Sequence, residues 1–404
     1  DKNNSTNSNN NNKNNDYDNN TNNKQIVVAV GTSRKVSDKL SKELAKITDR
    51  DRYSCTDALR ALKKMHKWAF TEEPTFLNDF HDTHDGVVKV IAFLTQTLGK
   101  DEETTTTTKD NDTDNDDTKE DEVDLIRTEC IKKSTRVLNC VIYSGKHNIN
   151  KDIAMKNVRS IIRDCDGINT LIRASEEYTG GDHILQLDAL YCVWCVLRNI
   201  TSKMDVLLAT EKKNKNEKVM ISKEQVLHLF ETGIGNLCCL TFVTDPTLVS
   251  RAMEQIFTAL SFIVKSRTKY VTKPYFQLTN EENESFLSIC LDVFKQLNDD
   301  DDGDGECVGG TFSWSPTGTT TRNAIVTEKA LVFFVECHKK QLFNDKTTAN
   351  NKNANKKSKT NDYETLIPFL GMTLKQFITN DKIRLTIITF LLDYCSSASA
   401  SSSG

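Results

Sequence analysis

The sequence predicts an all-α protein built as a helical solenoid, and three observations support this. Apolar residues recur at the three-four spacing of helices from residue 34 to residue 395, and strand-like alternation is almost absent. Residues 166–202 read as a glycine, a short amphipathic helix, a turn and a longer helix that is apolar almost all round. Such a helix has to be buried between neighbours. The flanking segments repeat the same order, so we expect helical units stacked in series.

Low-complexity stretches flank and interrupt the predicted helices. They are rich in Asn, Thr, Ser or acidic residues and lack the apolar side chains that would offset the entropy lost on ordering. We therefore expect disorder there and one continuous helical domain over residues 24–395. The expected disordered segments are the tail 1–23, the inserts 101–121, 298–321 and 344–361, and the tail 396–404.

A glycine-centred pattern occurs three times. Residues 76–94 align without gaps with residues 157–175, and residues 226–240 form a third copy. Each aligned glycine lies between two apolar-periodic runs, where a helix commonly ends in a left-handed residue that favours glycine. We expect one helix before and another after each of them. The aligned glycines are Gly86, Gly167 and Gly233.

A longer apolar helix is expected after each copy, over residues 123–143, 183–201 and 245–266. The last begins Asp245-Pro246, an N-cap followed by proline at the first helical position. Two weaker helix pairs follow, and one or two helices open the domain. The pairs cover 284–297 with 322–342 and 365–379 with 382–394, and the opening helices lie within 33–70. Periodicity leaves open whether residues 26–30 form a strand or a stiff arm.

The order of short helix, glycine, helix and long apolar helix resembles the armadillo repeat. The motifs that carry the resemblance are Asp-Gly-Ile-x-x-Leu-Ile, from Asp166, and Leu-Arg-Asn-Ile at the end of the long helix. It is closest over residues 150–202, weaker over 76–98 and 222–266, and covers about half of the chain. It implies a right-handed superhelix of about five armadillo-like units, with the third helices lining a concave face. The aligned glycines lie farther apart than the family's repeat length, because low-complexity inserts interrupt the units.

The resemblance also implies partner-binding residues. Armadillo proteins that grip extended peptides hydrogen-bond the peptide backbone with an Asn near the end of each third helix, and a Trp one turn earlier stacks on it. Asn199 matches this Asn, Asn139 matches it one unit earlier, and Arg198 closes the same helix as Asn199. Cys195 stands at the Trp position and Phe262 replaces the next Asn, so the ladder is incomplete. The other interpretation is a solvent-facing helix end, and under both interpretations we expect Asn199 to be exposed.

Two short motifs could carry metal or redox chemistry. Cys192-x-x-Cys195 lies mid-helix among apolar residues, not at a helix N-terminus where a thiol pKa would fall, and no second pair completes a zinc tetrad. Core packing is the simpler interpretation. His81 and His84 offer ligands at i and i+3 without an identifiable third, so a polar helix end is the simpler interpretation there.

The acidic run 299–306 fits the first half of a calcium loop. The twelfth position, where the loop needs a bidentate acid, is Thr311 or Gly309, and Pro316 argues against an exiting helix. Acidic low complexity is the simpler interpretation, with weak cation binding as the alternative. Neither a phosphate loop nor a nucleophile elbow occurs. We therefore expect no catalytic, metal-binding or cofactor-binding residues and no cofactor.

These observations favour a non-enzymatic scaffold or adaptor that binds a protein or peptide partner on the concave face. The alternative is a helical regulatory or catalytic subunit of an enzyme complex, which titratable residues converging in one deep pocket would favour. A third class, nucleic-acid binding through the basic region 34–67, is disfavoured because aromatic residues for stacking are sparse there and the net charge is −4.

Cysteine usage and hydropathy bear on location. The chain has 12 cysteines, most of them on apolar helical faces, whereas disulfide frameworks belong to short secreted chains. No apolar run reaches the length of a membrane span. We expect an intracellular protein, cytoplasmic or nuclear, without a membrane partner.

Overall fold

The computed structural model describes most of the predicted helical domain. The described residues are 37–71, 76, 78–99, 117–143, 151–178, 184–207, 221–240, 246–267, 290, 316–343 and 362–402. All regular structure within them is helical, so the predicted all-α class is confirmed for this part of the chain. None of the helices described is both long and apolar enough to cross a bilayer.

The helices follow one another along the chain without a strand in the described ranges. In order they are a helix over 37–48, α2 (Cys55–Phe70), the π-helical turn η1 (Asp79–Thr83), α4 (Gly86–Leu98), α5 (Asp117–Ile142), α6 (Lys151–Arg163), α7 (Gly167–Glu177), α8 (Ile184–Thr201), α10 (Lys223–Leu240), α11 (Pro246–Arg267), α14 (Pro316–Lys339), α15 (Asp362–Gln376) and α16 (Asp381–Ser402).

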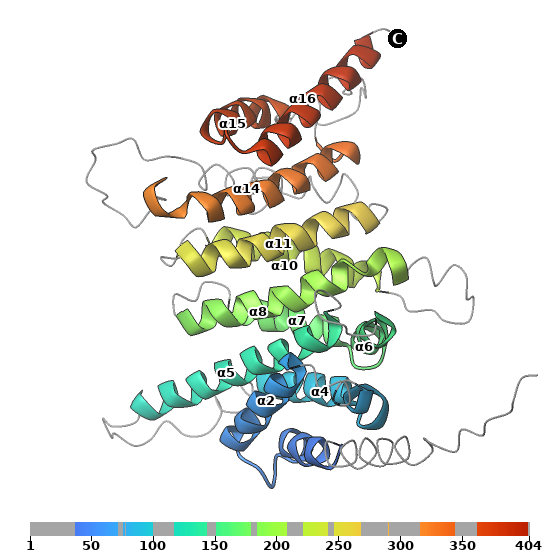
Figure 1. The fold of residues 1–404 in the computed structure, drawn as a ribbon, viewed down its shortest axis with the longest axis vertical. Coiled ribbons are helices and arrows are strands. Elements are labelled where there is room, and N and C mark those ends of the chain that lie inside the picture. Colours follow the sequence, from blue (N-terminus) through green and yellow to red (C-terminus); the bar gives the residue numbers. More distant parts are fainter. Residues whose placement is uncertain are drawn as a thin grey trace, which may run out of the picture.

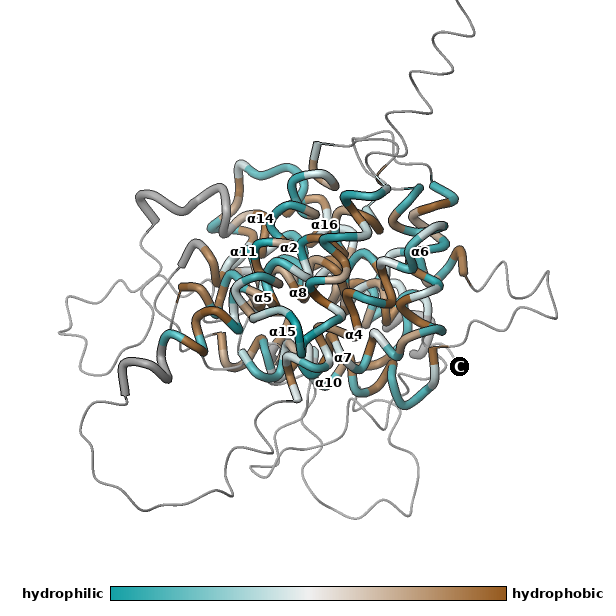
Figure 2. Tube along the Cα trace, turned by 90° about the horizontal axis from the view of Figure 1, so that it is seen from below, coloured by the Kyte–Doolittle hydropathy of each residue, from teal (hydrophilic) through white to brown (hydrophobic). Residues whose placement is uncertain are grey.

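The long helices stack in chain order as one layer. Helix α2 packs on α5, α5 on α8, α8 on α11, α11 on α14, and α14 on α16, so they form the successive rungs visible in Figure 1. Helices α4, α7 and α10 form a second layer, with α4 against α5, α7 against α8 and α10 against α11. Figure 2 looks along the stack and shows that hydrophobic and hydrophilic positions both occur along each helix. The apolar faces of the two layers meet and form the core.

Helix α8 lies at the centre of this core, as its apolar sequence predicts. Trp194 has 0% of its surface exposed, and its indole Nε1 donates a hydrogen bond of 2.7 Å to Oδ1 of Asn236 in α10. The cysteines of the Cys192-x-x-Cys195 motif are both buried in the same helix. The polar indole nitrogen is therefore satisfied inside an otherwise apolar environment.

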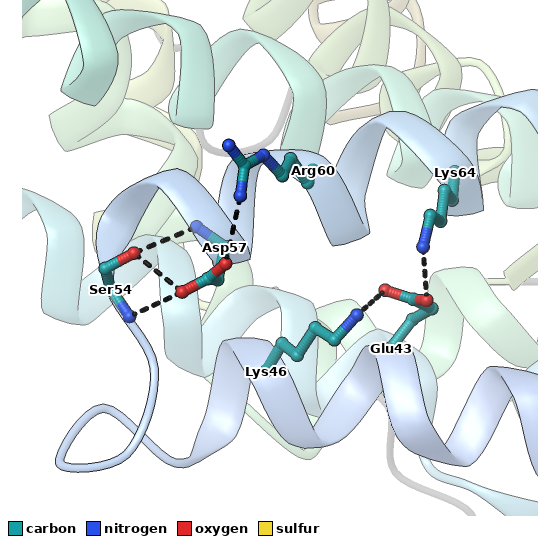
Figure 3. A network of polar contacts seen from close by, with 6 residues as sticks. All are labelled: Glu43, Lys46, Ser54, Asp57, Arg60 and Lys64. Atoms are coloured by element: carbon teal, nitrogen blue, oxygen red, sulfur yellow. Dashed lines mark hydrogen bonds and ion pairs between the residues drawn. The ribbon is translucent and has the colours of Figure 1, made fainter.

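Helix α2 begins with a capping box. The backbone N–H of Asp57 donates to Ser54 Oγ over 3.2 Å, and the backbone N–H of Ser54 donates to Asp57 Oδ2 over 3.3 Å, as Figure 3 shows. These bonds satisfy N–H groups that a helix start leaves without intrahelical partners. The cap fixes where α2 starts, and hence how it meets α5.

The aligned glycines act differently from the sequence expectation. The left-handed residues are Asp85 and Asp166, with φ of 47° and 48°, while Gly86 and Gly167 open helices α4 and α7. A Cβ on Gly86 would lie 2.6 Å from the ring of Phe80. These glycines are therefore required for close packing at a helix start, not for a positive φ.

The third copy has no break at its glycine. Helix α10 runs continuously through Gly233, so the predicted division of residues 226–240 into two helices is wrong. A Cβ on Gly233 would lie 2.9 Å from Leu260 Cδ2 and 3.1 Å from the Trp194 ring. Glycine here allows α10 to approach the long-helix layer.

Three predicted disordered segments are partly helical. Helix α5 begins inside the insert 101–121, and α14 begins at Pro316 inside the insert 298–321. Helix α16 continues through most of the predicted tail 396–404. The prediction that Pro316 argues against a helix is wrong, because proline at the first helical position sacrifices no intrahelical hydrogen bond.

Several other predictions fall outside the described residues. They concern the tail 1–23, the possible arm 26–30, the insert 344–361, the remaining parts of the inserts 101–121 and 298–321, the acidic run 299–306, and all of the predicted helix 284–297 except Cys290.

Candidate functional site

The two predicted asparagines meet across adjacent long helices. Nδ2 of Asn199 in α8 donates a hydrogen bond of 2.6 Å to Oδ1 of Asn139 in α5. Arg198 Nη2 donates to Asn199 Oδ1 over 3.1 Å. The structure thus brings together all three predicted partner-binding residues.

The predicted exposure of Asn199 is wrong, because only 4% of its surface is exposed. Its carbonyl and its amide are both engaged by neighbours in the structure. Asn139 is half-buried, and its Nδ2 donates no hydrogen bond to the residues that the structure describes. Asn139 therefore keeps both N–H donors of its amide for a bound main chain, whereas Asn199 already uses one of its two.

An ion cluster lies beside this pair on the same two helices. Asp188 of α8 accepts contacts of 2.8 Å from both Lys132 Nζ and Arg136 Nη2 of α5. Lys132 also contacts Glu129 at 2.8 Å. Burial alone would raise the pKa of Asp188, but the hydrogen bond from Lys132 and the charge of Arg136 hold this pKa below its ordinary value. Asp188 is therefore ionised at neutral pH and neutralises part of this positive charge.

The remaining cations nearby are less neutralised, because they form no direct ion pair in the described part of the chain. Among the described residues, no carboxylate lies within ion-pair distance of Lys133, Arg198 or Lys203. Burial and then the charge of Arg136 lower the pKa of Lys133, although the charge of Glu129 opposes them. Burial and then the charge of Arg198 lower the pKa of Lys203. Positive groups here thus repel one another, so a negative ligand would be stabilised.

The charges of this surface act on a residue of α2, and a further cation lies in α11. In α2, burial lowers the pKa of His66, and the charges of Lys133 and Arg136 lower it further. In α11, the guanidinium of Arg251 lies 4.2 Å from the ring centroid of Tyr191 in α8, a cation–π contact. We call this surface the long-helix face. It comprises His66, Lys133, Arg136, Asn139, Asp188, Tyr191, Arg198, Asn199, Lys203 and Arg251.

The two cysteines of the Cys192-x-x-Cys195 motif, which borders this face, are poorly reactive. Arg136 Nε donates to Cys192 Sγ over 3.3 Å, yet burial still raises the pKa of this thiol. Burial raises the pKa of Cys195 to about 12. Both thiols stay protonated at neutral pH and are poor nucleophiles, which supports the packing interpretation of the motif.

The basic region 34–67 is partly neutralised where the structure describes it, through ion pairs of Lys46, Arg60 and Lys64. Glu43 accepts hydrogen bonds of 2.8 Å from Lys46 and from Lys64, as Figure 3 shows. Burial tends to raise the pKa of Glu43, but these two lysines hold it below its ordinary value. In the same figure, Arg60 contacts Asp57 at 3.4 Å. These pairs weaken the case for a polyanion site in this region.

The two histidines of the His81–His84 motif have separate neighbours. His84 Nε2 lies 2.9 Å from Ser37 Oγ, and His81 Nε2 lies 3.7 Å from Asp82 Oδ1. In the described part of the chain, no three or more His, Cys, Asp or Glu residues lie close enough to hold a metal ion.

The Ser37–His84 contact lacks what a nucleophilic serine would need. Burial raises the pKa of nearby Asp79, and the charge of His84 lowers it. Oδ2 of Asp79 is buried without a hydrogen-bond partner among the described residues. An activated serine requires a base that a third group orients by a hydrogen bond. Among the described residues, Asp79 does not orient His84 in this way.

An open pocket of about 650 Å³ lies between the η1 turn and α6. Its lining includes Asp82 and Asp152 together with Lys156 and Arg159, and Lys156 Nζ lies 3.7 Å from Asp82 Oδ1. Charges of both signs line an open surface, so this pocket favours no particular reaction or ligand charge.

No family model, no curated protein and no solved structure matches this chain. The resemblance to the armadillo repeat therefore rests on the quoted motifs and stays a prediction.

Sequence reasoning missed most of the long-helix face. It found Asn139, Arg198 and Asn199 through the resemblance, but not Arg136, Lys133 or the Asp188 cluster. The residues that meet are separated by 52–60 positions. The packing of α5 on α8 brings these residues together. In the sequence alone, a row of charged residues on a helix that binds a partner cannot be told from one that only faces solvent.

Because Asn199 is buried, we expect Asn199→Ala to lower the free energy of unfolding by about 1–2 kcal/mol, from the lost hydrogen bond to Asn139. Urea denaturation of wild type, Asn199→Ala, Asn139→Ala and the double variant measures this. The cycle should give a coupling of about 1 kcal/mol between the two side chains. Unchanged stability of Asn199→Ala would contradict a structural role for the pair.

Proposed function

We propose that this protein is a binding scaffold whose helices form an α-solenoid of armadillo-like units, and that its long-helix face holds an acidic, extended segment of a partner protein. The stacking of successive long helices in chain order supports the solenoid. The quoted motifs support armadillo-like units.

The observation that carries the proposal is the excess of positive charge on the long-helix face. Lys133, Arg198 and Lys203 lack a carboxylate within ion-pair distance among the described residues, while Asp188 is already shared by two cations. A carboxylate from a partner would gain attraction to these groups and relieve their mutual repulsion. An acidic partner therefore fits this face better than a neutral or basic one.

A second feature favours an extended main chain in this position. The Nδ2 group of Asn139 is available as a donor, and the bonds from Arg198 and to Asn139 hold the Asn199 amide in place. The amide of Asn139 can therefore donate to a peptide carbonyl, while the neighbouring cationic side chains attract acidic residues of the same peptide. The site thus fits a peptide with acidic side chains.

Nucleic acid fits this face less well. Single strands bind through bases stacked on aromatic rings in addition to phosphate contacts. The aromatic ring of this face, that of Tyr191, is already covered by the guanidinium of Arg251 at 4.2 Å. A protein carboxylate needs no stacking platform.

The direct test is a titration followed by fluorescence anisotropy, with a short labelled peptide in which Glu alternates with Ser. We expect saturable binding that weakens with salt, and Lys133→Gln combined with Lys203→Gln should reduce affinity about ten-fold. The matched control is Lys156→Gln combined with Lys375→Gln, which removes the same charge from exposed positions on α6 and α15. This control should bind as wild type does.

Two results would contradict the proposal. Equal weakening by both double variants would mean that the peptide senses only net charge. Tighter binding of an RNA oligonucleotide of equal charge, with the same loss in the Lys133/Lys203 variant, would assign the face to nucleic acid.

A further inference from the structure

Cys55 lies exposed at the start of α2, beside a guanidinium. It is the first residue of the helix, directly after the N-cap Ser54, and Arg50 Nη2 donates to its Sγ over 3.1 Å. The carboxylate of Asp57 in the same turn is already held by Ser54 and Arg60. A helix start and an arginine both stabilise negative charge on a nearby sulfur. Cys55 therefore combines solvent access with the surroundings that a reactive thiol requires.

The guanidinium of Arg50 has a second donor without an acceptor. Its Nη1 is buried and makes no hydrogen bond to a described residue, although the central carbon of the group lies 4.9 Å from the centroid of the Phe93 ring. A buried donor is normally paired, because leaving it unpaired is unfavourable. The rigid fork holds Nη1 next to Nη2, which already bonds Cys55. An oxygen atom attached to the Cys55 sulfur would thus lie beside a free donor.

A second thiol contacts the same residue from α5. Cys130 is 1% exposed, and its Sγ donates to the backbone carbonyl oxygen of Cys55 over 3.8 Å. Burial and then the charge of Cys55 raise the pKa of Cys130 to about 12, although the charge of Arg50 opposes them. Cys130 is therefore shielded from dissolved oxidants. It is placed to react with Cys55 once Cys55 has been oxidised, as the second thiol of a redox-sensing pair does.

We propose that Cys55 is a site of oxidation by hydrogen peroxide, with Arg50 binding the added oxygen and Cys130 forming a disulfide with the product. The sulfur of Cys55 attacks one peroxide oxygen, so an S–O bond forms and the O–O bond breaks. The other oxygen leaves as water with the thiol proton. Sulfur loses two electrons, the peroxide gains them, and Cys55 becomes a sulfenic acid.

The second step consumes this sulfenic acid. The sulfur of Cys130 attacks that of Cys55, so an S–S bond forms and the S–O bond breaks. The hydroxyl group leaves as a second water with the thiol proton of Cys130. The disulfide then ties the start of α2 to α5, the next long helix of the stack. This chemistry is independent of binding at the long-helix face.

The first test treats the full chain with a small excess of hydrogen peroxide and maps its tryptic peptides by mass spectrometry without reduction. We expect a Cys55–Cys130 disulfide that dithiothreitol removes. In Cys130→Ser, the sulfenic acid should persist at Cys55 and be trapped by dimedone. Cys395 is the internal control, because it is also exposed but lies inside α16. It should be trapped about ten times more slowly than Cys55, the difference that one charge-assisted hydrogen bond gives.

The second test isolates the role of Arg50 in the Cys130→Ser background. Arg50→Gln should slow trapping at Cys55 about ten-fold, through loss of the same charge-assisted bond. Arg50→Lys keeps the charge and should react faster than Arg50→Gln. The matched control Arg52→Gln removes a nearby exposed cation and should react as the background does. Because Arg50 also contacts Phe93, the melting temperature of each variant is measured beside the rate.

Three results overturn the proposal. Equal trapping rates at Cys55 and Cys395 would show that the surroundings of Cys55 confer no reactivity. An unchanged rate in Arg50→Gln, with an unchanged melting temperature, would remove Arg50 from the site. Oxidation of Cys55 in the wild type to a sulfinic acid, or to a disulfide with a cysteine other than Cys130, would remove Cys130 as the second thiol.

Discussion

Replacing Trp194 with alanine is expected to lower the free energy of unfolding by about 3–5 kcal/mol. The indole is fully buried in the central helix α8 and reaches α10, where its Nε1 bonds Asn236. Its removal leaves a cavity between the two layers and ends that hydrogen bond. Urea denaturation followed by circular dichroism measures the loss.

Two comparison variants separate packing from polarity. Trp194→Phe keeps most of the ring and loses the hydrogen bond, so we expect a smaller loss of about 1–2 kcal/mol. Trp68→Ala removes a tryptophan that only partly packs against the core and should cost less than Trp194→Ala. A loss below about 1 kcal/mol for Trp194→Ala would show that α8 does not hold the two layers together.

The second large effect is expected at the start of α7. Gly167→Ala should lower the free energy of unfolding by about 1–3 kcal/mol, as overpacking does. A Cβ there would lie 2.9 Å from the carbonyl oxygen of Ile161 and 2.7 Å from its Cγ2. The carbonyl belongs to the backbone, so it cannot move aside as a flexible side chain could.

Gly235→Ala is the matched control for this substitution. Gly235 is exposed within α10, and a Cβ added to it would meet no atom of the described structure within 4 Å. Alanine is the better helix former by about 1 kcal/mol, so this variant should be slightly stabilised. Equal stability of Gly167→Ala and wild type in the same urea denaturation would mean that the close approach of Gly167 to Ile161 is not required.

The helices were predictable from sequence because each carries its own apolar period. The burial of Trp194 follows from that period, and the start of α11 at Pro246 follows from the preference for proline at the first helical position. The continuity of α10 through Gly233 was not predictable, because glycine serves equally for a turn and for close helix contact. The close approach of Leu260 and Trp194 distinguishes the two roles, and both belong to other helices.

The candidate site was predictable only in outline. The motif match pointed to Asn199, but its burial depends on Asn139 of a different helix, 60 positions earlier. The distinction between neutralised and uncompensated cations likewise requires the placement of Asp188 against α5. Sequence reports the number of charges, whereas binding depends on which of them lack an opposite charge nearby.

The serial packing of α2, α5, α8, α11, α14 and α16 has a mechanical consequence. Each of these helices packs mainly on the helix before it and the helix after it. A slight rotation between two neighbours therefore changes the orientation of every later helix. Rotations of this kind add along the stack while each junction keeps its contacts. If the long-helix face binds a partner as we propose, its shape can therefore adjust to the length of the bound segment at little cost to any one junction.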